Sequence, residues 1–176
     1  ITTLLIPLLM SREVSVESAS IVLATLGLTQ LPGRIWMLRG GRQPSPQSLA
    51  SLPLVLQGVG LAGVALAPSL VWSALGVAVF GLGAGLHTLA RPWLVQRLHG
   101  VADAGYWNGR VARVQGFGRA AGPLAVVAIA AWTSTTAVLW GLSAAMLALV
   151  PVAQRLTREL PETPVEVVHA QAAADR

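Results

Sequence analysis

Apolar residues in this chain occur in long blocks separated by short polar segments. Five blocks approach the roughly 20 residues that a helix needs to cross a bilayer. They are residues 20–38, 49–68, 69–90, 106–132 and 135–153. None shows the two-residue alternation of a membrane β-strand. Because backbone groups in lipid must be satisfied within their own segment, the blocks predict transmembrane helices.

Three shorter segments complete the predicted layout. The apolar stretch 1–10 is too short to span a bilayer, so we expect the sequence to begin inside a helix. Residues 67–69 and 133–135 are typical of tight turns. The acidic, proline-containing segment 156–176 predicts a disordered cytoplasmic tail. The expected fold class is an all-α polytopic transmembrane bundle over residues 1–155, with one partial and five full membrane helices.

Composition excludes a water-soluble domain. Hydrophobic residues form 54% of the chain and charged residues 11%, with a mean hydropathy of +0.66, whereas soluble domains carry about 25% charge. There is no cysteine, so no disulfide framework or thiolate metal site is expected. Neither a P-loop nor a hydrolase motif occurs, and the three histidines are not spaced as metal ligands. We therefore expect no enzyme, no cofactor and no bound metal.

The net charge of +5 comes from arginines that lie between apolar blocks, which indicates membrane topology and not nucleic-acid binding. If residues 11–19 face outward, ten arginines fall in or near segments on the inner side. They are Arg34, Arg39, Arg42, Arg91, Arg97, Arg110, Arg113, Arg155, Arg158 and Arg176. Only Arg12 lies outside, and Arg119 lies within a block. This bias predicts a multi-pass protein of a bacterial inner membrane with a cytoplasmic C-terminus.

Several polar residues lie inside the apolar blocks. Asn108, Gln115 and Arg119 are seven and four residues apart and share one helical face. An unpaired charge at the depth of Arg119 costs at least about 2.5–3.5 kcal/mol, and no block contains an acid. Arg119 thus needs backbone carbonyls in a structural or gating role, a partner in a missing segment, or an anionic substrate.

Other intramembrane polar residues add to this set, although a lone glutamine or histidine is more often an interhelical hydrogen-bond donor than a ligand contact. The full set of candidates for a substrate cavity is Gln30, Gln57, His87, Gln115 and Arg119.

Glycine motifs mark two blocks and one loop. Glycines four residues apart let another helix approach closely, and the predicted packing residues are Gly81, Gly85, Gly118, Gly122 and Pro123. A glycine- and arginine-rich segment, residues 33–42, covers the end of the block 20–38 and the loop after it, with loop-motif residues Gly33, Arg34, Arg39, Gly40 and Arg42. The glycine-rich fourth block ends in Thr-Leu-Ala-Arg-Pro, and a basic segment leads from it to Asn108 and Gly109.

Together these motifs resemble the C-terminal six-helix half of a major facilitator superfamily transporter over nearly all of residues 1–155. That family carries Gly-x-x-x-Asp-Arg-x-Gly-Arg-Arg in the loop after the second helix of a half. This chain retains Gly33, Gly40 and Arg42 but has Met37 and Leu38 at the Asp and Arg positions.

The fifth helix of the half also matches in part. The family's antiporters have Gly-x-x-x-Gly-Pro-x-x-Gly-Gly in the equivalent helix. Gly118, Gly122 and Pro123 fit this motif, whereas Val126 and Val127 replace its last two glycines.

The resemblance implies transport of a small solute by alternating access, with the substrate between this half and a missing N-terminal six-helix half in the bilayer. The mode of transport that we consider is efflux of the solute coupled to proton movement. The alternative is a non-transporting membrane scaffold, an accessory subunit or an inactive remnant. Another six-helix block encoded upstream would favour transport, and a start codon near Ile1 would favour the alternative.

Overall fold

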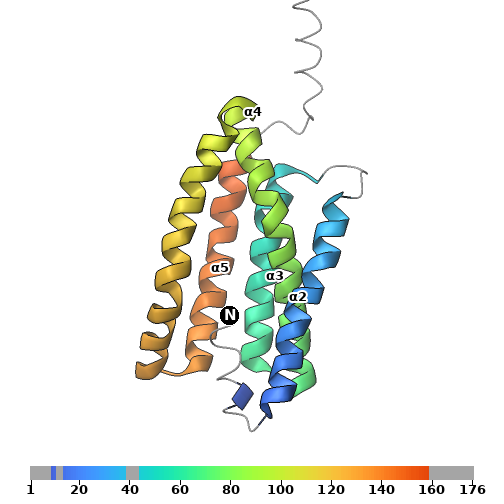
Figure 1. Cartoon of the computed structure of the whole chain (residues 1–176), viewed down its shortest axis with the longest axis vertical. Coiled ribbons are helices and arrows are strands. Elements are labelled where there is room, and N and C mark those ends of the chain that lie inside the picture. Colours follow the sequence, from blue (N-terminus) through green and yellow to red (C-terminus); the bar gives the residue numbers. More distant parts are fainter. Residues whose placement is uncertain (1–8, 11–13, 39–43, 159–176) are drawn as a thin grey trace, which may run out of the picture.

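The computed structural model describes residues 9–10, 14–38 and 44–158, and the regular structure in these ranges is helical throughout. The long helices are α2 Val16–Leu38, α3 Pro46–Leu66, α4 Leu70–Trp132 and α5 Thr135–Thr157. They stand side by side in an elongated bundle (Figure 1). The prediction of an all-α fold is confirmed over the described residues.

Side-chain caps explain where two of the helices begin. Ser45 precedes α3, and its hydroxyl accepts a hydrogen bond from the backbone N–H of Ser48 at 3.2 Å. Pro46 follows at the first helical position, where its missing N–H leaves no bond unmade. Ser134 caps α5 in the same way, accepting from the N–H of Ala137 at 3.1 Å. These caps satisfy donors that the first turn of a helix leaves free.

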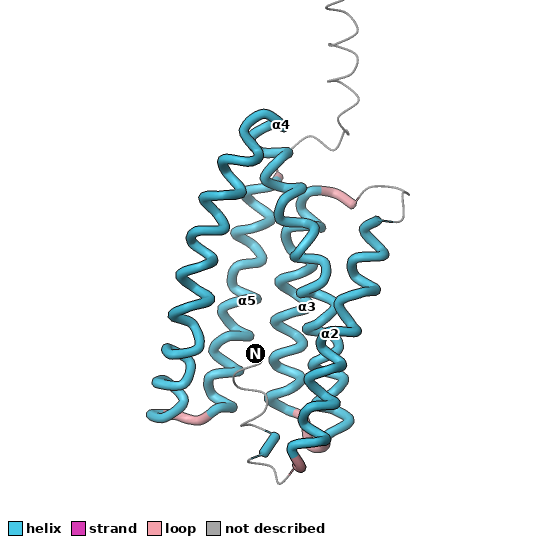
Figure 2. Tube along the Cα trace, viewed as in Figure 1, coloured by secondary structure: helices cyan, strands magenta, loops and turns pink. Residues whose placement is uncertain are grey.

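α4 is a hairpin of two helical arms. A straight helix of its 63 residues would be about 95 Å long. Instead the chain reverses at Gly100, where φ is +78° and ψ is 167°, and the second arm runs back beside the bundle (Figure 2). Glycine lacks a Cβ and adopts this left-handed conformation without strain. One residue therefore suffices to reverse the direction of the chain.

The α4 hairpin corrects one prediction. We expected residues 91–107 to form a cytoplasmic loop between two separate helices, but they are helical except at Gly100. Pro92 does not end the first arm, because a proline inside a helix removes one hydrogen bond without necessarily stopping the helix. Both arms consequently extend beyond the predicted boundaries and meet at a single-residue turn.

Glycines allow α3 to pack against the first arm of α4 at backbone contact. A Cβ added to Gly60 would lie 2.5 Å from the backbone N of Phe80 and 2.8 Å from the carbonyl oxygen of Gly76. On the other side of α3, the Ser143 hydroxyl donates a buried hydrogen bond to the carbonyl of Gly58 at 2.8 Å. α3 is therefore fixed between α4 and α5.

α2 packs against the first arm of α4 in a similar way. A Cβ on Gly33 would lie 2.7 Å from the carbonyl oxygen of Leu82. Gly81 and Gly85 are buried, and their nearest neighbours include Thr29 and Gln30 of α2. In lipid the hydrophobic effect does not drive helices together, and small residues at crossings like these allow the close van der Waals contact that does.

The second arm of α4 is much less covered. Large apolar side chains lie exposed along it, with Phe117 74%, Leu124 75% and Trp132 90% accessible. α5 is also largely uncovered, since only 17% of its most apolar stretch is buried. Exposed apolar surface on this scale marks contact with a membrane or another protein.

The number of candidate spans is smaller than predicted. Within the described ranges three helices are long and apolar enough to cross a membrane, namely α3, α4 and α5, whereas the sequence predicted five full spans. α4 counts once although it has two arms. α2 is not among the three, and its sequence places Gln30, Pro32 and Arg34 in the last half of the helix.

Arginines gather at one end of the bundle. This arginine end is formed by the end of α2, the start of α3, the Gly100 turn and the end of α5 (Figure 1). Seven described arginines lie toward it: Arg34, Arg91, Arg97, Arg110, Arg113, Arg155 and Arg158. Arg119 lies farther along the second arm. The antiparallel packing of the helices therefore segregates charge that is scattered along the sequence.

Parts of the predicted layout fall outside the described residues. They include residues 1–8 of the partial helix and the loop-motif residues Arg39, Gly40 and Arg42. Most of the predicted tail, residues 159–176, also lies outside. Gly33 and Arg34 lie within α2, not in a loop.

Replacing Gly60 by alanine tests the close approach of α3 and α4. We expect the free energy of unfolding in detergent, measured by titration with a denaturing detergent, to fall by about 1–3 kcal/mol because backbone atoms must move. The control is Gly116→Ala, since no heavy atom lies within 4 Å of a Cβ at Gly116. A control variant as unstable as Gly60→Ala would contradict the packing described.

Candidate functional site

A hydrogen bond joins the two arms of α4 near the arginine end. Arg91 in the first arm donates through Nη1 to Oε1 of Gln115 in the second arm, 24 residues later. Both side chains are partly buried. Gln115 was a predicted cavity residue, whereas Arg91 was expected to lie in a loop. The bond places a guanidinium and a carboxamide in the gap between two antiparallel helices.

Helical spacing extends this contact by one turn on each arm. His87 lies four residues before Arg91, and Arg119 lies four residues after Gln115, so each shares a face with a bonded residue. Since the arms are antiparallel, both extensions run away from the Gly100 turn. We call His87, Arg91, Gln115 and Arg119 the polar row. Within the described chain no ion pair or hydrogen bond engages the Arg119 side chain, which is exposed.

The other two predicted cavity residues lie elsewhere in the bundle. In α2, Oε1 of Gln30 accepts a hydrogen bond from Arg34 Nη2 at 3.2 Å. In α3, Gln57 is partly buried, and its Cγ would lie 3.1 Å from a Cβ added to Gly83 of α4. Both glutamines therefore lie at helix crossings with the first arm of α4. They are not part of the polar row.

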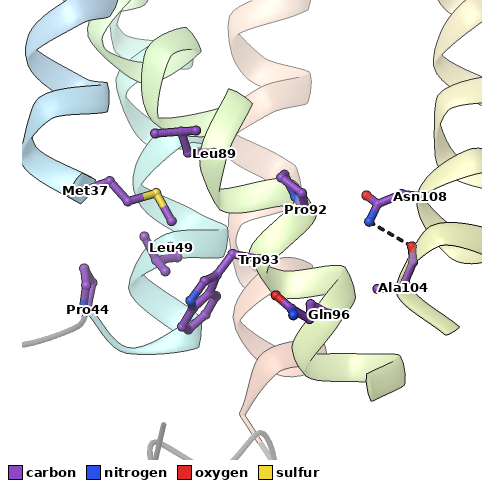
Figure 3. Close-up of a pocket in the computed structure, with 9 residues that line it drawn as sticks. All are labelled: Met37, Pro44, Leu49, Leu89, Pro92, Trp93, Gln96, Ala104 and Asn108. Atoms are coloured by element: carbon purple, nitrogen blue, oxygen red, sulfur yellow. Dashed lines mark hydrogen bonds between the residues drawn. The ribbon is translucent and has the colours of Figure 1, made fainter. Parts of the chain in front are cut away.

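A cavity of about 550 Å³ opens at the arginine end (Figure 3). Its walls come from α2, the start of α3 and both arms of α4, with lining residues Met37, Pro44, Leu49, Leu89, Pro92, Trp93, Gln96, Ala104 and Asn108. None of the five predicted cavity residues lines it. Its volume lies within the roughly 300–1,000 Å³ typical of small-molecule pockets.

Asn108 is the most notable polar group in this cavity wall. Its Nδ2 donates to the carbonyl of Ala104 at 2.9 Å, and its Oδ1 is buried with no hydrogen-bond partner. Buried polar atoms are rarely left unpaired. Arg34 Nε, in α2, is likewise buried without a partner. Two of the three buried side-chain atoms without a partner in the described residues thus lie near the arginine end, the third being Ser73 Oγ in the first turn of α4.

The predicted packing glycines divide into two groups. Gly81 and Gly85 contact α2, as described above. For Gly118 and Gly122 in the second arm, no heavy atom of the described residues lies within 4 Å of an added Cβ. Pro123, which follows them, is exposed. The second arm thus presents its glycines to open space.

Arg91 could have been found from the sequence if its segment had been predicted as helix and not as loop. His87 and Arg91 are four residues apart, so a helix that continued through Pro92 would have placed them together. Asn108 was already grouped with Gln115 and Arg119 on one face. Trp93 and Gln96 gave no such signal, because the walls of their cavity come from helices distant in sequence.

No group of three or more histidine, cysteine or acidic residues that could hold a metal occurs among the described residues. No protein-family model, curated protein or solved structure matches the chain. Its function has therefore to be inferred from its own residues and geometry.

A double-mutant cycle on Arg91→Ala and Gln115→Leu measures the bond between the arms. We expect a coupling of about 0.5–1.5 kcal/mol in the free energy of unfolding, the range found for interhelical hydrogen bonds in membranes. The same cycle with Arg155→Ala and Gln115→Leu should be additive, since no hydrogen bond joins that pair. Zero coupling in the Arg91 cycle would contradict the contact.

Proposed function

We propose that this chain is one half of a membrane transporter for small solutes, which works by alternating access. The observation that supports it most is the Arg91–Gln115 hydrogen bond between the arms of α4, with the exposed His87 and Arg119 one turn farther along the same helix faces. Arg91 and Gln115 form a hydrogen bond inside a bundle of apolar helices, and Arg119 lies one turn deeper. Ionisable residues at such positions in membrane helices commonly mark substrate or ion pathways.

In this proposal the arginine end faces the cytoplasm of a bacterial cell. Arginine is retained preferentially on the cytoplasmic side during membrane insertion. α3, α5 and both arms of α4 then cross the bilayer, with α2 as a further span whose polar residues face its neighbours. At about 1.5 Å per residue each arm of α4 is longer than the roughly 30 Å hydrocarbon layer, so the Gly100 turn would stand in the cytoplasm.

The resemblance to the major facilitator superfamily provides the mechanism. A second six-helix half would pack against this one, and the solute would lie between them near the midplane. The loosely covered second arm supports a missing neighbour, since Gly118 and Gly122 have open space beside them. His87 and Arg119 would then face the solute path, and His87 is the titratable group that could couple proton movement to efflux.

The rival assignment is a static membrane scaffold or accessory subunit. It uses the same glycines and exposed apolar surface for binding partner helices, but it needs no water-filled path. Water access to the polar row from both sides of the membrane separates the two functions without requiring a known substrate.

Single cysteines at Gln115 and Arg119 provide this test, because the chain has no cysteine of its own. The protein is expressed as its gene encodes it, with any cysteine outside these 176 residues replaced by serine. A membrane-impermeant maleimide is added to intact cells and, separately, to inverted vesicles. We expect both positions to be labelled from both sides, because an alternating path exposes them in turn.

The matched control is Leu124→Cys in the same arm. Leu124 is apolar, 75% exposed and nine residues from Gln115, which puts it on the opposite side of the helix, so in the proposed bilayer it faces lipid and should remain unlabelled from either side. Labelling of Gln115→Cys and Arg119→Cys from one side only, or from neither, would contradict alternating access and favour the scaffold.

A further inference from the structure

A second cavity lies at the arginine end between α3 and α5. It has a volume of about 360 Å³ and is lined by Gln47 of α3 and by Pro151, Gln154, Arg155 and Arg158 of α5. It is separate from the polar row and from the larger cavity beside Asn108. Its volume is at the lower end of the range for small-molecule pockets, suited to a compact polar group.

The cavity carries positive charge without a described counter-charge. Arg155 and Arg158 are three residues apart at the end of α5 and therefore lie on one face. Both are exposed, and no ion pair engages either side chain within the described ranges. Of the two described acids, Glu17 begins α2 at the opposite end, and Asp103 lies beside the Gly100 turn and does not line the cavity. Neighbouring like charges repel each other, so this arrangement favours an anion.

The chemistry of the lining residues narrows the class of anion. Guanidinium groups bind phosphate oxygens through paired hydrogen bonds, which makes arginine well suited to phosphate. The side-chain amides of Gln47 and Gln154 add neutral N–H donors to the same cavity. A phosphate ester carrying hydroxyl groups would satisfy both kinds of residue.

The exposed apolar surface of α5 favours a lipid over a soluble phosphate. Leu149 and Val152 of α5 are 50% and 48% exposed, and they lie three residues apart just before the arginines. Leu156, four residues after Val152, is 72% exposed. These three side chains form an apolar stripe on a different face of α5 from Arg155 and Arg158. In the proposed bilayer this apolar surface keeps the end of α5, and with it the cavity, at the membrane interface, where lipid phosphates lie.

We propose that this cavity binds the phosphate of an anionic phospholipid from the cytoplasmic leaflet. The inference rests on the membrane placement of α3 and α5 in the proposed function. Basic pockets between membrane helices on the cytoplasmic side are known to hold such head groups. The bound lipid would neutralise the repulsion between Arg155 and Arg158 and join the ends of α3 and α5.

The test is native mass spectrometry of the full protein in detergent, titrated with phosphatidylglycerol and with phosphatidylcholine. We expect Arg155→Gln with Arg158→Gln to weaken phosphatidylglycerol binding by about 25-fold, roughly fivefold for each arginine. Phosphatidylcholine binding should not change. The charge-matched control, Arg110→Gln with Arg113→Gln in α4, should retain affinity within about twofold, since neither residue lines the cavity.

A double lysine variant, Arg155→Lys with Arg158→Lys, is the control for misfolding of the glutamine variant. It keeps the positive charge but loses the paired hydrogen-bond geometry of arginine. We expect it to bind phosphatidylglycerol with an affinity between those of the native protein and the glutamine variant. Equal losses in the cavity and control glutamine variants would overturn the site. Competition by soluble glycerol 3-phosphate as effective as that by the lipid would overturn the lipid assignment.

Alkaline extraction of membranes that contain the protein distinguishes a failure of the lipid site from a failure of the membrane placement on which it rests. A chain that leaves the membrane at high pH contradicts the membrane placement itself. A chain that stays in the membrane while binding phosphatidylglycerol equally with and without the two arginines contradicts only the lipid site.

Discussion

The exclusion of charge from hydrocarbon is the constraint from which the account of this protein follows. A guanidinium in lipid is costly, and a backbone group without a partner is costly as well. Long apolar helices pair their backbone groups within the helix. The antiparallel order of α2, α3, the arms of α4 and α5 keeps most guanidinium groups out of the apolar region, since it brings seven arginines scattered from Arg34 to Arg158 to one end. Arg119 departs from this pattern, and for that reason it is a functional candidate.

Glycine determines how closely the helices stand, and it does so unevenly. α2, α3 and the first arm of α4 meet where a Cβ at Gly33, Gly60 or Gly76 would strike backbone atoms. The second arm has glycines too, but Gly118 and Gly122 face open space. The described bundle therefore combines a close-packed part with a loosely held arm. In the proposed transporter this loosely held arm is the surface on which a second half would pack.

The sequence predicted the helices well because apolar blocks of this length without two-residue alternation are typical of helices and not of strands. It predicted the turn before α5 for the same reason, since Ser134 is a capping residue between two apolar blocks. It failed between residues 91 and 107, where Pro92 and the surrounding charges suggested a loop and only Gly100 breaks the helix. Of the candidate site, Gln115 could be found from helical spacing. Its partner Arg91 and the cavity beside Asn108 depend on tertiary contacts between distant segments, which spacing within one helix does not report.

The sidedness of the arginine end is the central claim, and paired reporter insertions measure it most directly. Alkaline phosphatase, active only outside the cytoplasm, and green fluorescent protein, used as the cytoplasmic reporter, are each inserted after Ala102 beside the Gly100 turn and after Ser134 before α5. We predict fluorescence and no phosphatase activity at Ala102, with the opposite result at Ser134. Both positions reporting the same compartment, or the reverse assignment, would contradict a bundle that spans the membrane with its arginines in the cytoplasm.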